Sequence, residues 1–449
     1  MTTATSKTPE SGPLEAGNRP ADRRRMFNNL ILHIHPPTVP EKTMGFTHTW
    51  GLGGMSVVLF LILVVTGILL MLGYEPFPGQ AYDSIVILQK DVLFGQLVRN
   101  IHHWSGNILL IVSVLHLLRV YFTNAFYETR RLNWIIGLGL LLFVLASNFT
   151  GYLLPWDQRA YWTVTICAGM LEYLPFLGHW LQRMIIGGEE VGGATLSLFF
   201  TVHVVVMPIC FFLLMPYHFW LVRKAGGVVV PRSPGTGLEK RPIHVPTVPH
   251  LITREISAGL ILIACVMVYA LIFDAPLEGK ANPGLSPNPA KAPWYLMGVQ
   301  ELFMHFHPLF AVWIIPFITT VAIVILPYFK YDPEMTGVWF CSHTGRRMAS
   351  TAAVMALVLT PVAVVSSSLF MDFAGWLPHW PAVISNGMMP LLIILGAFVG
   401  LYVIMKKHYK PSKNEAFQTL FIFMLIAYII LTTICYVFRG PGMALGWAF

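Results

Sequence analysis

Nine long apolar segments separated by polar loops run along the chain. Each is about twenty residues long, the length that a helix needs to cross the hydrocarbon core of a bilayer. Because lipid contains no water to satisfy an exposed backbone, we expect every segment to be helical. The predicted spans are residues 50–73, 100–122, 134–154, 197–222, 255–274, 307–329, 348–370, 387–406 and 415–437. The pattern therefore predicts an all-α integral membrane protein, a transmembrane helix bundle of about nine spans.

The loops fix an orientation for this bundle. Loops after the even-numbered spans carry most of the Lys and Arg, whereas loops after the odd-numbered spans are longer and richer in Asp and Glu. Basic loops stay in the cytoplasm, so the N-terminus is expected inside and the C-terminus outside. We therefore expect a multi-pass protein of a bacterial-type inner (cytoplasmic) membrane.

Composition supports the membrane assignment and limits the other classes. Hydrophobic residues make up 55% of the 449 residues and charged residues only 11%, against about 25% charged residues in soluble proteins. The formal net charge of +8 sits largely in short loops, which favours membrane orientation over nucleic-acid binding. The five cysteines show neither CxxC nor CxxCH spacing, so they indicate neither a zinc site nor covalent c-type haem.

Four histidines lie inside two of the spans, His102 and His116 in the second, His203 and His218 in the fourth. On a helix the first two lie ~21 Å apart and within ~40° of one face, and the second two within ~60°. Polar side chains in lipid are costly and usually serve a partner or a cofactor. Two facing helices would form two histidine pairs, one near each surface, as bis-imidazole ligation of two stacked b-type haems requires. The alternative is four hydrogen-bonded core histidines.

Glycines repeat the histidine spacing of fourteen. Gly53 and Gly67 lie in the first span, Gly137 and Gly151 in the third. Glycine weakens a helix, so its presence suggests that a bulky group, such as a porphyrin edge, approaches the backbone closely. Helix packing is the alternative explanation, because glycine is common in membrane helices.

Two arginines flank the histidines of the second span. Arg99 precedes His102 by about one turn, and Arg119 follows His116 by about one turn. Each lies toward the nearer membrane surface, where haem propionates would need a cation. The alternative is that they are interfacial residues whose charged ends reach the membrane surface.

Several stretches of the chain resemble a known protein family. The matching stretches are RNIHHWSGN, HLLRVYFT, TGYLLPWDQRAYWTV, GGATLSLFFTVH and KAPWYLMGVQELF. With the glycines they extend over about residues 28–330, and they resemble the cytochrome b subunit of the cytochrome bc/bf complexes, the quinol:cytochrome c oxidoreductases. The chloroplast-type and Gram-positive branch is the most similar, because its second histidine pair is also fifteen residues apart.

The resemblance implies an enzyme and its partners. His102 and His203 would ligate the outer, low-potential haem, and His116 and His218 the inner, higher-potential haem. Quinol would be oxidised at the outer face, with one electron passing to a Rieske iron-sulfur protein and a c-type cytochrome. The other would cross two non-covalent b haems to a quinone at the inner face, coupled to proton translocation. A homodimeric complex embedded in membrane lipid, drawing on the quinone pool and binding no nucleic acid, is expected.

The outer quinol site departs from the family pattern. Where the family has Pro-Glu-Trp-Tyr, this chain has the residues 292–295, Ala-Pro-Trp-Tyr, so the carboxylate credited with accepting a quinol proton is missing. Glu301, about two helical turns further on, is the nearest replacement, with His305 as a further outer-side group. The residues expected at this site are Pro293, Trp294, Tyr295, Glu301 and Tyr161.

Two further expectations concern the inner face and the cofactor count. Arg223, His33 and His35 are weaker candidates for the inner quinone site. Gly51 stands where chloroplast-type relatives have a cysteine that carries an additional covalent haem. All haem is therefore expected to be held non-covalently.

The expected regions follow from these assignments. Residues 1–25 lack the apolar core of a secretory signal and are expected to form a disordered cytoplasmic tail. The other regions are 26–225, the four-helix dihaem domain; 226–254, a cytoplasmic linker; 255–346, the C-terminal cytochrome b domain with the quinol-site loop; and 347–449, additional transmembrane helices.

Two other functions fit part of this pattern. One is a dihaem membrane anchor that passes electrons between a soluble dehydrogenase and the quinone pool, although such anchors are usually shorter bundles. The other is a transporter without haem that relays protons through its histidines. A reduced-minus-oxidised spectrum separates the second alternative from the haem proteins.

Overall fold

The structure is a computed structural model and describes residues 35–231, 242–330 and 336–446. Within these ranges nine helices are long and apolar enough to cross a membrane. They match the nine predicted spans to within a few residues at most ends, which confirms the all-α membrane fold. The predicted tail, residues 1–25, and His33 lie outside the described residues.

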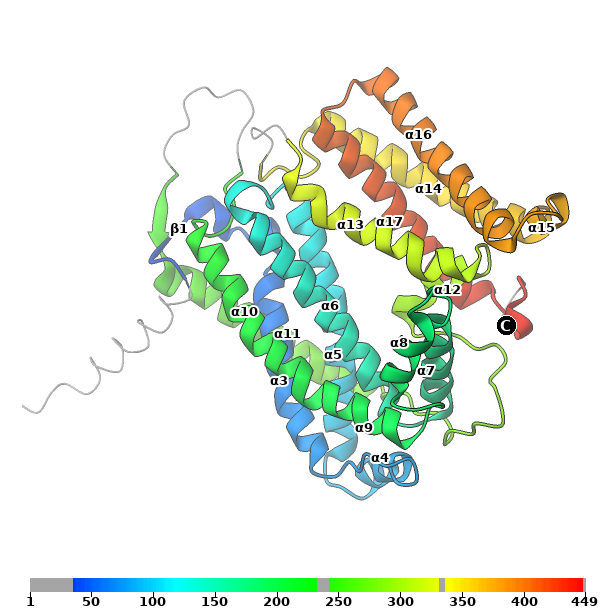
Figure 1. Cartoon of the computed structure of the whole chain (residues 1–449). Coiled ribbons are helices and arrows are strands. Elements are labelled where there is room, and N and C mark those ends of the chain that lie inside the picture. The colour runs from blue at the N-terminus through cyan, green and yellow to red at the C-terminus, as the bar shows by residue number, and fades with distance from the viewer. Residues whose placement is uncertain (1–34, 232–241, 331–335, 447–449) are drawn as a thin grey trace, which may run out of the picture.

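Four of these helices form a bundle at one side of the molecule (Figure 1). They are α3 (Leu52–Met71), α5 (Gly95–Phe122), α6 (Arg131–Leu153) and the continuous helix made of α9 (Gly193–Thr201), a π-helical turn (Val202–Val206) and α10 (Met207–Lys224). Helix α3 packs along α5, and α6 along α10. Buried apolar side chains from these helices and from α11 (Thr247–Ile272) fill the bundle, among them Leu59, Leu110, Val144, Phe211 and Val266.

Short elements lie at the two ends of this bundle. The helices α4 (Ala81–Lys90), α7 (Gln158–Leu171) and α8 (Gly178–Ile186) occupy one end, together with α12 (Met297–Phe303) (Figure 1). A two-stranded antiparallel sheet of β1 (Thr38–Pro40) and β2 (His244–Pro246) occupies the other end. The predicted orientation makes the first end the outer one and the sheet end the inner one.

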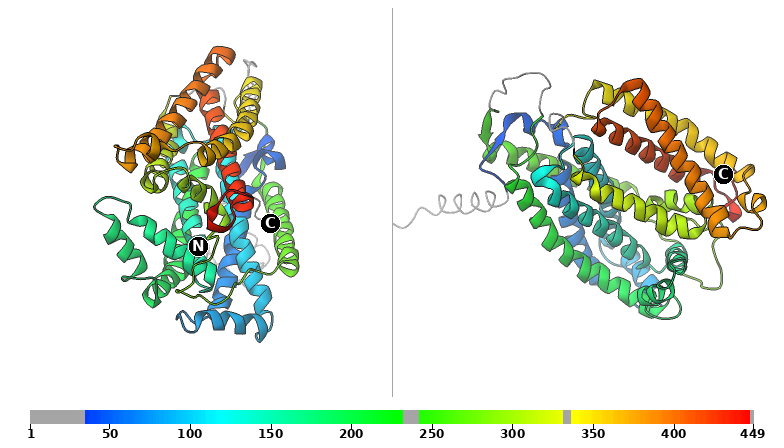
Figure 2. Two further views of the ribbon diagram at one scale, coloured as in Figure 1. Left: turned by 90° about the vertical axis from the view of Figure 1, so that its right-hand side faces the viewer. Right: turned by 45° about the horizontal axis from the view of Figure 1, so that its top comes forward.

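The remaining spans form a second layer beside the bundle (Figure 2). They are α13 (Ile315–Ile325), preceded by a π-helical turn (Leu309–Ile314), α14 (His343–Leu369), α16 (Met389–Tyr409) and α17 (Lys413–Phe438). Helix α17 packs along α14 and also along α12, which the sequence places in the quinol-site segment. The C-terminal helices therefore contact the candidate site.

A buried polar cluster ties the two layers together near the inner end. The Gln418 side chain on α17 donates to the Tyr121 carbonyl at 3.2 Å and to the Asn124 side-chain oxygen at 2.8 Å. Asn124 in turn donates to the Cys341 sulfur at 3.1 Å. Because an unpaired buried amide is costly, these bonds fix the inner end of α17 against α5.

Candidate functional site

The four histidines meet in two pairs inside the four-helix bundle. His102 on α5 faces His203 in the π-helical turn, with ring centroids 6.2 Å apart and planes at 70°. His116 on α5 faces His218 on α10, at 6.4 Å and 74°. Among the described residues no cluster of three or more His, Cys, Asp or Glu could hold a metal ion. The possible ligands are therefore arranged two by two, at two depths of the bundle.

The π-helical turn explains how a spacing of fifteen residues serves the second pair. A π turn closes its hydrogen bonds over five residues and so takes up one residue more than an α turn. Val202–Val206 is such a turn and contains His203. A spacing of fifteen residues that includes one π turn therefore gives His203 and His218 nearly the same angular offset around the helix axis as a spacing of fourteen residues in a regular α-helix. The π turn could not be recognised from the sequence, so a regular α-helix was assumed there and the pair was placed at a ~60° offset.

Two threonines hold the outer pair and were missed by the sequence reasoning. Thr66 Oγ1 lies 2.9 Å from His102 Nδ1, and Thr150 Oγ1 lies 3.2 Å from His203 Nδ1. Each hydroxyl also donates to a carbonyl one turn earlier in its helix, at 2.7 and 2.8 Å. The imidazole Nδ1–H is therefore the donor to threonine, which leaves Nε2 with its lone pair. Metal-binding histidines are commonly held in this way.

A sequence signal for these threonines exists. Each directly precedes one of the spaced glycines, giving a Thr-Gly pair at 66–67 and again at 150–151. The repeat at the outer level of both spans singles these two threonines out from the others in the apolar helices.

The four spaced glycines lie directly against the four imidazoles. A methyl group added at Gly67 would lie 3.3 Å from His102 Cε1, and one at Gly151 only 2.6 Å from His203 Cε1. The inner pair repeats the arrangement, with 3.6 Å from Gly53 to His116 and 3.3 Å from Gly137 to His218. The glycines thus make room for the imidazole rings. Their predicted contact with a porphyrin edge stays a prediction.

The spacing of the rings is a test of whether an iron porphyrin fits. A metal ion bound to two imidazole nitrogens at roughly 2.0–2.1 Å, each nitrogen about 1.1 Å from its ring centre, separates the ring centres by about 6.3 Å. Both observed separations, 6.2 and 6.4 Å, agree with that value. The residues present therefore fit axial ligation of one iron by each pair.

The predicted propionate arginines are buried and already bonded. Arg99 donates to the carbonyls of Ala275 and Pro276 at 2.8 and 2.7 Å. Arg119 donates to the His48 carbonyl at 3.0 Å, and its Nη2 lies 3.1 Å from His48 Nε2. The pKa of His48 is lowered, first by burial and also by the Arg119 charge, against a hydrogen bond to the Val229 carbonyl that raises it. The propionate role of both arginines stays a prediction.

The Pro293–Tyr295 segment lies against the four-helix bundle that carries the paired histidines. The Trp294 indole donates to the Asn107 side-chain oxygen on α5 at 2.7 Å, and Tyr295 packs against the core of the bundle. The Tyr295 hydroxyl is buried without a hydrogen-bond partner in the described residues, and burial raises its pKa. Tyr161 on α7 is buried in a neighbouring cluster with Trp156.

Glu301 is fully buried on α12 and is held by two groups. Arg439, just beyond α17, places Nη2 2.6 Å from Glu301 Oε1 and Nε 3.1 Å from Oε2. His305 Nε2 lies 3.2 Å from Oε1. Burial raises the pKa of Glu301, but the hydrogen bonds from His305 and Arg439 and the arginine charge outweigh it, so this pKa lies below its ordinary value. Arg439 gave no sequence signal, because a basic residue at a span end is usually interfacial.

Two of the residues predicted at the inner quinone site, His35 and Arg223, lie in the described part of the chain. His35 Nε2 lies 3.5 Å from Glu255 Oε2, and burial lowers the pKa of His35. Arg223 lies in the last turn of α10, which ends at Lys224. The role of both residues at the inner quinone site stays a prediction.

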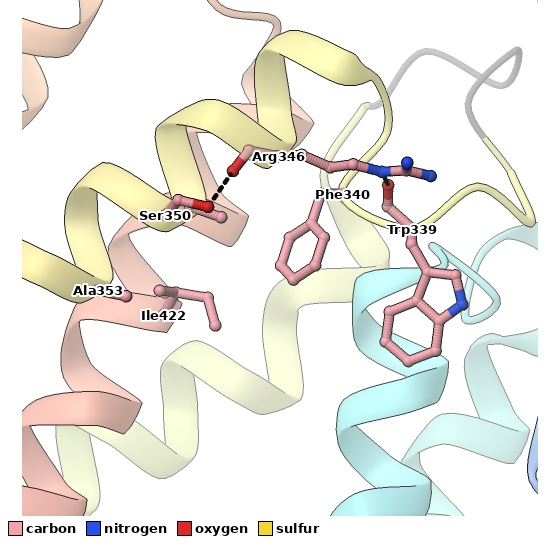
Figure 3. Close-up of a pocket in the computed structure, with 7 residues that line it drawn as sticks. Trp339, Phe340, Arg346, Ser350, Ala353 and Ile422 are labelled. Atoms are coloured by element: carbon pink, nitrogen blue, oxygen red, sulfur yellow. Dashed lines mark hydrogen bonds between the residues drawn. The ribbon is translucent and has the colours of Figure 1, made fainter.

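A cavity of about 490 Å³ lies elsewhere, between α14 and α17 near their inner ends (Figure 3). It is lined by Trp339, Phe340, Arg346, Ala349, Ser350, Ala353 and Ile422. None of these residues belongs to the predicted haem or quinol sites. The cavity therefore lies apart from those predicted sites.

Comparisons with known proteins match the N-terminal half most closely. The model of the family described as cytochrome b/b6/petB matches residues 40–226. Cytochrome b6 of Prochlorococcus marinus (strain MIT 9515) is 39% identical over 175 residues, which is 39% of this chain and 80% of that protein. Cytochrome b6 of Prochlorococcus marinus (strain NATL1A) is 40% identical and that of Synechococcus sp. (strain CC9605) 39%, with the same coverage.

A likeness of fold extends further along the chain. A chain of the solved structure described as "Hyperthermophilic respiratory Complex III" matches with a TM-score of 0.66 and 22% sequence identity. The match covers 93% of this chain and 98% of that chain. The shared fold therefore reaches into the C-terminal helices, for which the sequence alone gave no residue-by-residue match.

Proposed function

The chain belongs to the cytochrome b/b6 family, and from that premise we propose that it is the dihaem subunit of a respiratory quinol:cytochrome c oxidoreductase. Family membership makes it a multi-pass, haem b-binding cytochrome b of the bc type. The observation that carries the finer proposal is the pair of imidazole pairs, at 6.2 and 6.4 Å, stacked at two depths of one bundle. One such pair would serve a single redox centre. Two at different depths suit an electron path across the membrane.

The four histidines are the proposed iron ligands. His102 and His203 would hold the outer haem, with Thr66 and Thr150 fixing their tautomer, and His116 and His218 would hold the inner one. Bound iron supplies a one-electron carrier at each depth. Arg99 and Arg119, near the two ends of α5, are the proposed cations for the propionates.

Quinol binds at the outer end in this proposal, beside Pro293, Trp294, Tyr295 and Tyr161. Oxidation of one quinol to quinone releases two electrons and two protons. One electron passes to a Rieske iron-sulfur protein and then to a c-type cytochrome. The other crosses the bundle to a quinone at the inner face. The buried Tyr295 hydroxyl, which has a hydrogen to donate, is suited to orient the ring oxygen of the quinol.

Glu301 and His305 are the proposed route for the released protons. Their side chains form one hydrogen-bonded pair at 3.2 Å. The lowered pKa of Glu301 keeps it a carboxylate, which is the form that shares a proton with an imidazole. The pair takes over the role of the acid that Pro293 replaces.

The test uses the complex purified from its native membrane. Pyridine haemochrome analysis should give two b haems per chain, and decylubiquinol or a menaquinol analogue should reduce cytochrome c. Mass spectrometry of the intact complex should contain a Rieske protein. His116→Leu should lose the inner haem and keep the outer. A haem-free preparation overturns the proposal, and a flavoprotein dehydrogenase in place of the Rieske protein would favour the membrane-anchor alternative.

A further inference from the structure

The last spanning helix, α17, lies along the quinol-site segment. The Tyr428 hydroxyl donates to the Tyr295 carbonyl at 2.7 Å. Gly298 packs so closely on α17 that an added methyl group would lie 2.6 Å from a Tyr428 ring carbon and 2.8 Å from the Thr432 hydroxyl. Any larger side chain at this position would have to displace Tyr428 or Thr432, so α12 is closely fitted to α17 at this point.

Further bonds continue this contact along the segment. The Lys291 ammonium donates to the Tyr436 carbonyl at 2.8 Å. The Gln300 amide donates to the Ala290 carbonyl at 2.6 Å, and its oxygen accepts from the Ala292 backbone at 2.8 Å. The turn that contains Pro293 is thus braced from both sides by groups on α12 and α17.

The strongest contact is the ion pair between Glu301 and Arg439. Both side chains are buried, with 0% and 3% of their surface exposed. The charged and titratable groups around Glu301 are Arg439 just beyond α17, the Cys435 thiol on α17, and His305 from its own segment. Helix α14 adds two hydroxyls, Ser367 at 3.0 Å from His305 and Ser368 at 3.5 Å from Arg439. Removing one partner of a buried pair leaves an uncompensated charge, which is strongly destabilising.

The segment is held on its other face by the dihaem bundle. Trp294 donates to Asn107 on α5, five residues after His102. The position of the turn at residues 293–295 is therefore set between two supports, α5 on one side and α17 on the other.

We propose that Arg439 is a positioning residue for quinol oxidation, which through Glu301 fixes where α12, Trp294 and Tyr295 lie beside the dihaem helices. The inference rests on the proposed function. It assigns a role to the C-terminal part of the chain, beyond residue 347. Arg439 does not touch the reacting atoms in this proposal. It acts through Glu301.

Arg439→Gln in the purified complex is the direct test. We expect quinol:cytochrome c reductase activity to fall roughly 10- to 100-fold, as for the loss of other supporting groups, with a higher KM for quinol. Because Arg439 helps to hold the Glu301 pKa down, the acid limb of the pH profile should move to higher pH. Both haems should assemble, and their reduction from the inner quinone site should be unchanged.

Two further variants are measured together with Arg439→Gln. Arg183→Gln removes an exposed arginine at the outer end, bonded to Glu189 at 2.7 Å, and should leave activity and pH profile unchanged. Tyr428→Phe removes one hydrogen bond without leaving a buried charge, so it keeps the test valid if Arg439→Gln fails to fold. It should raise the quinol KM roughly 2- to 10-fold.

The outcomes separate this inference from the proposed function. Normal turnover in the Arg439→Gln complex would overturn the positioning role. So would slow turnover with an unchanged KM for quinol and an unchanged acid limb of the pH profile. An unchanged KM for quinol in Tyr428→Phe would also overturn it. A wild-type complex that lacks reductase activity would instead overturn the proposed function. The positioning role is thus tested in the variant complexes, and the proposed function is tested in the wild-type complex.

Discussion

Single glycines decide how closely the helices of this bundle approach the histidines. Gly151 and Gly139 lie on the same helix, α6, but only Gly151 faces an imidazole. A methyl group at Gly151 would lie 2.6 Å from His203, whereas none of the surrounding heavy atoms lies within 4 Å of one at Gly139. The pair is therefore a matched test of whether the space beside His203 is needed.

Gly151→Val should lose the outer haem and keep the inner one, while Gly139→Val keeps both. The added side chain pushes His203 from its position, and overpacking of this kind costs about 1–3 kcal/mol. Difference spectra and haem-to-protein ratios of the purified variants measure the effect. A Gly151→Val complex with both haems at unchanged potentials would contradict it.

The lowered pKa of Glu301 leads to a prediction about how quinol oxidation depends on pH. Its folded-state pKa is depressed, so the carboxylate persists below its ordinary pKa and is lost only as the pH falls through the lowered value. We expect quinol oxidation in the wild type to decline on that acid limb, and Glu301→Gln to slow it roughly 100-fold and remove the limb. Both haems should still assemble and accept electrons from the inner face.

The matched control for that variant is Glu189→Gln, an exposed carboxylate bonded to Arg183. It should change neither the rate nor the pH profile. Near-normal turnover in Glu301→Gln would give the proton-accepting role to His305 alone or to a chain of water molecules.

At the scale of elements, the π-helical turn Val202–Val206 is the feature on which the second histidine pair depends. Deleting Val205 shortens the spacing of His203 and His218 from fifteen to fourteen and should convert the turn to ordinary α-helix. Both haems should then remain. Inserting one alanine after Phe211 instead rotates His218 by ~100° relative to His203, and should abolish the inner haem. Haem content measures both, and a deletion variant that lacks either haem would refute the explanation.

The elements themselves were largely predictable, and their contacts were not. All nine spans follow from hydropathy because each must satisfy its backbone within lipid. The histidines and glycines followed from their shared spacing. The ion pair of Glu301 with Arg439 did not, because its partners are 138 residues apart and neither has a periodic pattern. The π turn is equally hidden, since a run of valines has the same hydropathy in either helix type.

The molecule as a whole holds its cofactor, in our proposal, by ligation and packing alone. Gly51 stands where a covalent attachment point would be expected, and Cys341 is buried and bonded to Asn124 at 3.1 Å, in the cluster that joins the two layers. Acidified acetone should therefore extract all haem, and no haem-linked peroxidase band should survive denaturing electrophoresis. A surviving band at the mass of this chain would show that one of its cysteines carries haem.

Thr66 and Thr150 also have a consequence for how the complex is made in the cell. By accepting the Nδ1 hydrogens of His102 and His203 they leave both Nε2 atoms as acceptors, with ring centroids only 6.2 Å apart. Two acceptors do not attract each other, whereas a metal ion between them binds both. A ligand that binds only the folded chain stabilises it by mass action. If iron porphyrin binds here as proposed, we therefore expect its supply during biogenesis to raise the fraction of newly inserted chains that stay folded.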